Sequence, residues 1–117
     1  MNRDLGRRLR RQLRQLADLA WERELSNELS NLATSFDEWK AGKLEPHELS
    51  DRIHKFHHGG ARELYGLYTR VHPLQLVVRA VGLGVLAESE VPAELLTDLA
   101  PAIESYRTEQ ERALAEE

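Results

Sequence analysis

All five histidines of this 117-residue chain lie between positions 47 and 72, and histidine is the side chain that changes charge near neutral pH. His54 and His58 are four residues apart, so on a helix they share one face, which Asp51 extends backward. Two imidazoles and one carboxylate leave a coordination position open to water, as catalytic zinc sites do. One hypothesis makes His54, His58 and Asp51 ligands of a divalent metal such as zinc. We favour the alternative, a solvated helix end without a cofactor, whose histidines interact with the helix dipole.

Four residues separate Arg52 from His57. This spacing resembles the Arg-x4-His signature of HEPN-type ribonucleases, which are small all-helical proteins that commonly dimerise, although Ile53 stands where that family usually has a polar residue. The resemblance implies that His57 acts as general acid or base on a ribose 2′-hydroxyl, and that Arg52 steadies the phosphate charge. Whether the chain is an enzyme stays open on these residues alone.

Gly59 and Gly60 precede a helix that the sequence predicts from Ala61 to about Thr69. A helix start of this kind leaves backbone N–H groups free, and Arg62 in its first turn makes it a candidate anion site. We favour the alternative, a flexible break that ends the second helix and folds the third helix back on it.

The sequence also predicts one long helix from about Leu5 to about Lys40. Residues 2–40 contain no proline and a single glycine, and apolar residues recur at steps of three and four. The stripe consists of Leu5, Leu9, Leu13, Leu16 and Ala20, followed after one slip by Trp21, Leu25, Leu29, Leu32, Phe36 and Trp39. A helix of about 36 residues is roughly 54 Å long and would overhang a bundle of shorter helices. We expect residues 21–39 to pack on the domain and residues 1–20 to project as a helical arm.

Proline and glycine divide the rest of the chain into shorter helices. Gly42 suits the C-terminal cap of the long helix, and Pro46 suits the first turn of a second helix. Pro73 begins a helix that is apolar nearly all round, which indicates burial. A further helix begins at Pro92, and Pro101 is expected to interrupt or restart it.

The expected fold is therefore all-α, a helical bundle of about five helices in a single domain of residues 1–117. No apolar stretch is long enough to span a bilayer, so we expect no membrane segment. The absence of cysteine excludes disulfides and thiolate metal sites and agrees with a reducing cytoplasm. Three segments, Phe36-Asp37-Glu38-Trp39, 53–57 and 62–65, resemble a family of small all-helical bacterial proteins without an assigned activity. That resemblance implies a bacterial, cytoplasmic protein.

The net charge of −4 is unevenly placed along the chain. Residues 1–14 hold six arginines, and residues 88–117 hold nine acidic side chains. We expect these oppositely charged ends to meet within one molecule or between two subunits. The alternative is an arginine face, formed by Arg7, Arg11 and Arg14, that contacts nucleic acid with strongly salt-dependent binding.

Our leading hypothesis for function is a binding or regulatory protein that associates through helices, as a homodimer or with another protein. The projecting arm would leave its leucines without cover, and exposed apolar stripes of that kind mark partner surfaces. The expected interaction residues are Leu5, Leu9, Leu13, Leu16, Arg7, Arg11 and Arg14. The alternative hypotheses are a histidine-based metal-binding protein and an HEPN-like ribonuclease that uses Arg52 and His57.

Overall fold

The computed structural model describes residues 3–116 of the chain, with side chains from Gly6 onward. Within this part every regular element is a helix and none is a strand, which confirms the all-α prediction. The chain divides into two compact units where the sequence predicted one domain. Unit 1 consists of Met1–Ala20 and Val71–Glu117, and unit 2 consists of Trp21–Arg70.

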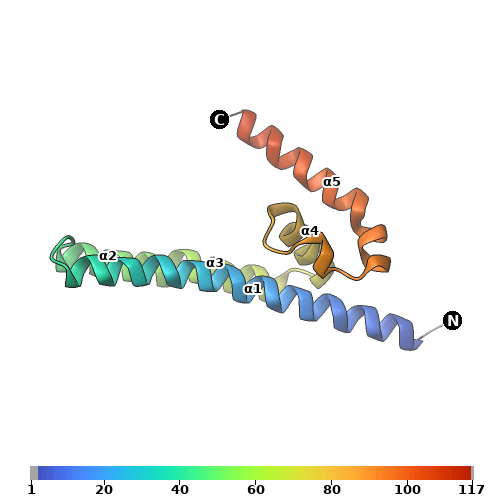
Figure 1. Ribbon diagram of the computed structural model, residues 1–117, viewed down its shortest axis with the longest axis horizontal. Coiled ribbons are helices and arrows are strands. Elements are labelled where there is room, and N and C mark those ends of the chain that lie inside the picture. The colour runs from blue at the N-terminus through green and yellow to red at the C-terminus, as the bar shows by residue number, and fades with distance from the viewer. Residues whose placement is uncertain (1–2, 117) are drawn as a thin grey trace. The chain divides into compact units, whose positions relative to one another are not determined.

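The predicted long helix is α1 (Arg3–Lys40), which contributes to both units (Figure 1). It ends at Gly42, whose φ of 76° lies in the left-handed region that favours glycine. The Gly42 N–H donates to the Trp39 carbonyl at 3.0 Å, and the Lys43 N–H donates to the Glu38 carbonyl at 2.8 Å. These bonds satisfy carbonyls of the last helical turn, so Gly42 is the predicted cap.

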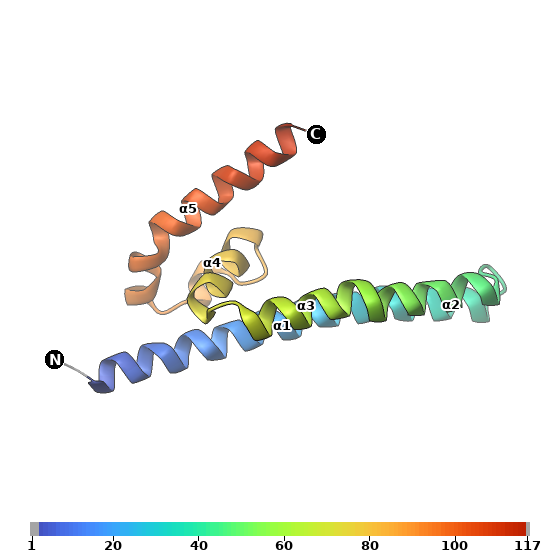
Figure 2. The same ribbon diagram turned by 180° about the vertical axis from the view of Figure 1, so that it is seen from behind.

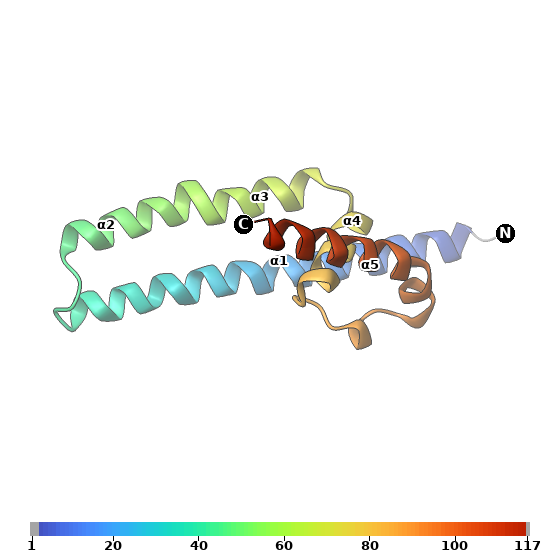
Figure 3. The same ribbon diagram turned by 90° about the horizontal axis from the view of Figure 1, so that it is seen from above.

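The remainder of unit 2 is formed by α2 (Pro46–Lys55), η1 (Phe56–Gly60) and α3 (Ala61–Arg70). The middle element η1 is a π-helical turn, in which the Ala61 N–H donates to the Phe56 carbonyl five residues earlier. The three elements follow one another without a break, so 46–70 is one continuous helix. Figure 3 shows this helix beside the second part of α1, as the two antiparallel legs of a hairpin, and Figure 2 shows the same pair from behind.

The prediction that the second helix ends at Gly59 and Gly60 is wrong. A β-carbon placed on Gly60 would lie 2.8 Å from a carboxylate oxygen of Glu28 on the other leg. Gly60 therefore lies inside a helix, against the end of the Glu28 side chain, and not at a turn. Neither glycine has a positive φ, and the backbone keeps its helical course through both.

Unit 2 buries few side chains for its length. Three apolar residues of the hairpin, Leu44, Leu49 and Leu64, are buried, together with the polar Ser35. A two-helix hairpin offers only one face of each leg to the other. The opposite faces of its helices have no third layer within the unit.

Unit 1 joins the first part of α1 to α4 (Pro73–Leu83), the short η2 (Glu88–Glu90) and α5 (Ala93–Ala115). The Nδ1 atom of His72 caps α4 by accepting from the Leu74 N–H at 3.1 Å. Gly84, with a φ of 82°, ends the helix. The apolar α4 has a largely buried interior, as the sequence predicted, and Leu76, Val77, Ala80 and Val81 are among the best-covered side chains.

The expectation that the projecting arm leaves its leucines uncovered is wrong for Leu13 and Leu16. Leu13 is 6% exposed and Leu16 is 9% exposed, and Ala17 and Ala20 are also buried. All four belong to the same compact unit as the core residues of α4 and α5. The physical reason is the apolar α4, whose surface needs more cover than α5 alone provides.

The helix that starts after Pro92 is not interrupted at Pro101, and that prediction is also wrong. α5 runs from Ala93 to Ala115 with Pro101 inside it, in an exposed position. With 46–70 also continuous, the described chain has four uninterrupted helical rods, where the sequence predicted about five helices. None of the described helices has both the length and the apolar character needed to cross a bilayer.

Candidate functional site on the helical hairpin

Three contacts fix the register of the two legs of the hairpin. Arg52 donates to Ser35, Gly60 lies against Glu28, and Tyr68 donates to Glu24. Arg52, Gly60 and Tyr68 on the second leg are eight residues apart. In a regular α-helix of 3.6 residues per turn, positions eight apart do not point in the same direction, so they would not all face a straight partner helix. The wider π-turn takes up part of this drift, which explains why η1 lies in the middle of the leg.

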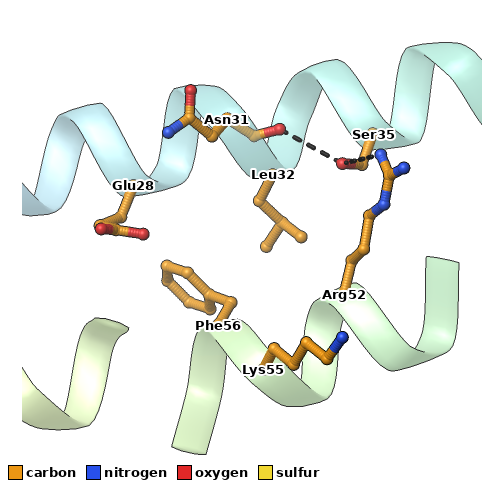
Figure 4. Close-up of a pocket in the computed structure, with 7 residues that line it drawn as sticks. All are labelled: Glu28, Asn31, Leu32, Ser35, Arg52, Lys55 and Phe56. Atoms are coloured by element: carbon orange, nitrogen blue, oxygen red, sulfur yellow. Dashed lines mark hydrogen bonds between the residues drawn. The ribbon is translucent and has the colours of Figure 1, made fainter. Parts of the chain in front are cut away.

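Arg52 links the two legs at the end of the hairpin where residues 41–45 connect them. Its guanidinium donates to the Ser35 hydroxyl at 3.0 Å, and Ser35 in turn donates to the Asn31 carbonyl at 3.4 Å (Figure 4). The guanidinium also lies 3.6 Å from the Glu38 carboxylate. A hollow of about 250 Å³ adjoins these contacts, with Leu32 and Phe56 from opposite legs among its lining residues. This is smaller than the roughly 300–1,000 Å³ of a small-molecule site.

The structure gives the proposed ribonuclease pair different surroundings. Arg52 lines the hollow and contacts α1, whereas His57 is exposed on η1 and does not line that hollow. The contacts of Arg52 therefore have a structural explanation, the pairing of the two legs. The HEPN-like role of Arg52 and His57 stays a prediction that no contact between them supports.

Three exposed histidines gather around the junction of α2 and η1. The ring centroids of His54 and His58 are 4.3 Å apart, and those of His57 and His58 are 5.0 Å apart in an edge-to-face arrangement. The charge of His54 lowers the pKa of His58 below its ordinary 6.5, and desolvation, His57 and Arg62 act in the same direction. These neighbours therefore favour the uncharged form of the His58 imidazole.

The three-ligand metal site predicted at Asp51, His54 and His58 is not formed. Within residues 3–116 no group of three or more histidine, aspartate or glutamate side chains is placed to hold one ion. The helix does bring the two imidazoles together, as their spacing predicted. What the sequence did not show is that the carboxylate of Asp51 would lie outside the group.

The anion site predicted at Arg62 loses the helix start on which it depended. The N–H of Ala61 is bonded to Phe56 within the continuous helix, so it is not free to bind a ligand. Arg62 instead lines an open surface groove of about 700 Å³ with His58 and Arg70. Glu63 lines the same groove, so its two arginines are accompanied by one carboxylate.

Aromatic stacking links the two legs at the other end of the hairpin, away from residues 41–45. The Trp21 ring stacks on Tyr68 with centroids 5.7 Å apart and an interplanar angle of 2°, and it meets Tyr65 edge-on at 6.1 Å. The Tyr68 hydroxyl donates to Glu24 at 2.5 Å. Tyr65, by contrast, is 63% exposed.

The interaction residues predicted on the first part of α1 have mixed surroundings. Leu9 is half-buried, Leu13 and Leu16 are buried, and the Leu5 side chain lies outside the described residues. The arginine face of Arg7, Arg11 and Arg14 is exposed, so its contact with nucleic acid stays a prediction. Burial removes the reason for assigning a partner surface to Leu13 and Leu16.

Exposed apolar residues lie instead on the second part of α1, where the sequence predicted a packed segment. We use "the seam" for the residues Leu25, Leu29, Leu32, Phe36 and Trp39, which follow one another at steps of four and three. Three of these residues are exposed by 36% or more, namely Leu29 at 47%, Phe36 at 36% and Trp39 at 41%. Leu25 and Leu32 are half-buried, and Leu32 also lines the hollow between the legs. Alternating steps of three and four are typical of a coiled-coil interface, and this signal could have identified the surface.

Comparison with known proteins gives no information about these sites. No protein-family model, no curated protein and no solved structure matches the chain. The two resemblances inferred from short motifs gain no support from these comparisons. The candidate sites are therefore argued from geometry.

Proposed function

We propose that the chain is a helix-mediated binding or regulatory protein that works as a homodimer, with the seam on α1 as its interface. The observation that carries this proposal is the exposure of Leu29, Phe36 and Trp39 along one helix face. Monomeric proteins rarely expose contiguous large apolar side chains in this way. A second copy of the hairpin would turn two legs into a four-helix arrangement with a shared core.

The sparse core of the hairpin supports the same proposal. A fifty-residue unit with three buried apolar side chains removes little apolar surface from water, at about 25 cal/mol per Å². Two of the contacts between the legs are polar, namely Arg52 with Ser35 and Tyr68 with Glu24, and the Trp21 ring that stacks on Tyr68 is only half-buried. Association through the seam would supply the apolar burial that the legs do not give one another.

The charges of the two legs favour a second copy as the partner. Residues 21–40 contain five acidic and two basic side chains. Residues 46–70 contain four arginines or lysines, four histidines and three acids. When the acidic leg of one copy packs beside the basic leg of the other, opposite charges face each other at the rim of the seam. The resemblance to small bacterial proteins leads us to place this dimer in the bacterial cytoplasm.

The oligomeric state tests the proposal directly. Light scattering coupled to size-exclusion chromatography, at micromolar protein, should give twice the chain mass of 13.4 kDa. Replacing Leu29→Glu and Phe36→Glu together should give the monomer mass, because charge would be buried in the seam. The far-ultraviolet circular dichroism of the variant should still report a helical protein.

Leu114→Glu is the matched control, because Leu114 is 67% exposed on α5 and lies outside the seam. This variant should remain a dimer. A monomeric wild-type chain at micromolar concentration would overturn the proposal. So would a Leu29→Glu, Phe36→Glu variant that stays dimeric.

A further inference from the structure

A second feature of the hairpin, independent of the seam, is the pair of imidazoles at the junction of α2 and η1. His54 and His58 lie on one face of the continuous helix with ring centroids 4.3 Å apart. We propose that His54 and His58 chelate one divalent transition-metal ion on the helix surface, with water completing the coordination.

The separation of the two rings suits a shared ion. Two nitrogens bound at about 2.0–2.1 Å in tetrahedral geometry lie roughly 3.3 Å from each other. Imidazole nitrogens lie on the rim of the ring, so rings with centroids 4.3 Å apart reach this separation by side-chain rotation, without movement of the backbone. A continuous helix holds both Cα atoms in place, which reduces the entropy that chelation costs.

The two imidazoles are also available to a ligand. Both side chains are exposed, and no hydrogen bond within the described residues involves either of them. His72 is different, since its Nδ1 atom is already bonded to the Leu74 N–H as the cap of α4. His47 is exposed on α2 but has no second histidine beside it. His57 also lies beside His58, but edge-to-face and at the larger centroid separation of 5.0 Å, so His54 and His58 are the closer pair of imidazoles.

The chemistry of the donors limits the ion. Imidazole is a ligand for nickel, copper and zinc, whereas magnesium and calcium require oxygen ligands. Two imidazoles without a carboxylate should therefore bind Ni²⁺ and Zn²⁺ and leave Mg²⁺ unbound. Copper should bind most tightly of the three transition metals, in line with the general order of divalent-ion affinity.

Isothermal titration of the full chain, purified without a histidine tag and stripped with a chelator, tests this proposal. Ni²⁺ should bind with one ion per chain, and Mg²⁺ should give no heat of binding at the same concentration. His54→Ala and His58→Ala should each weaken Ni²⁺ binding by about tenfold or more, because each removes half of the chelate.

His47→Ala is the matched control and should bind Ni²⁺ as the wild type does. All three positions are exposed, so these variants should keep the helical circular dichroism of the parent chain. Equal losses in His47→Ala and His58→Ala would show binding to scattered histidines and overturn the site. Unchanged binding in His54→Ala would overturn it as well. A monomeric chain that still binds Ni²⁺ would refute the dimer and leave the metal site standing.

Discussion

The close packing of α4 against α5 depends on Gly82, which has a hydrogen atom in place of a side chain. A β-carbon at this position of α4 would lie 2.5 Å from Cδ1 and 3.2 Å from Cε1 of Tyr106 on α5. The ring of Tyr106 is half-buried and rigid, so it cannot bend away as the end of a flexible side chain can. Gly82 therefore sets the distance between α4 and α5.

Gly82→Ala should lower the free energy of unfolding by about 1–2 kcal/mol. An overpacked core costs about 1–3 kcal/mol, and the better helix propensity of alanine offsets about 0.5–1 kcal/mol of this. Gly66→Ala is the control, since a β-carbon there meets nothing within 4 Å and should raise stability by about 0.5–1 kcal/mol. Urea unfolding of both variants measures the difference. A Gly82→Ala variant as stable as Gly66→Ala would contradict the close approach.

At the scale of the element, the π-turn η1 determines which face of α3 meets α1. Leu64 is buried and Tyr68 is bonded to Glu24, and both follow the turn. Each residue of an α-helix rotates the chain by about 100°. The extra residue of the turn therefore sets the rotation of α3 about its own axis, and so decides which of its side chains face α1.

Deleting Gly59 should destabilise the hairpin by at least about 3 kcal/mol. Residues 60–70 would turn by about 100°, which exposes Leu64 at about 1.5–3 kcal/mol and breaks the bond from Tyr68 to a carboxylate at about 1.5–3 kcal/mol. Thermal unfolding followed by circular dichroism measures the effect. Gly59→Ala keeps the length of the turn and meets nothing within 4 Å, so it should unfold no earlier than the wild type. If the deletion behaves like Gly59→Ala, η1 does not set the register.

At the scale of the whole molecule, the two units bury very different amounts of apolar surface. Unit 1 contains fourteen of the seventeen buried apolar residues, and the hairpin contains three. A proposed dimer through the seam would therefore stabilise the hairpin far more than unit 1. Binding to the folded state raises stability by mass action, so the effect depends on protein concentration.

Hydrogen exchange should reveal this difference between the units. In the monomeric Leu29→Glu, Phe36→Glu variant, amides of 46–70 should exchange faster than in the wild type, while amides of Leu76 to Val81 should keep their protection. Mass spectrometry of peptic peptides measures both regions in one sample. Leu114→Glu, which should stay dimeric, should show wild-type exchange in the hairpin. Equal hairpin protection in monomer and dimer would contradict the dependence of unit 2 on association.

Much of the secondary structure was predictable because it depends on neighbours within a few residues. The extent of α1, its cap at Gly42 and the proline at the start of α2 follow from local hydrogen bonds and backbone preferences. The pairing of His54 with His58 follows in the same way from their four-residue spacing. The absence of Asp51 from that group did not follow, because three-residue spacing brings side chains only roughly into line.

The sequence by itself determined that the chain is helical and where most of its helices begin and end. The tertiary structure decided which apolar residues of α1 are covered: Leu13 and Leu16 are buried, whereas Leu29, Phe36 and Trp39 stay exposed. It also placed Gly60 inside a continuous helix, with the Glu28 side chain of the other leg against it. Burial and close approach depend on contacts between segments far apart in the chain. A local sequence pattern does not indicate which distant segment will pack against it.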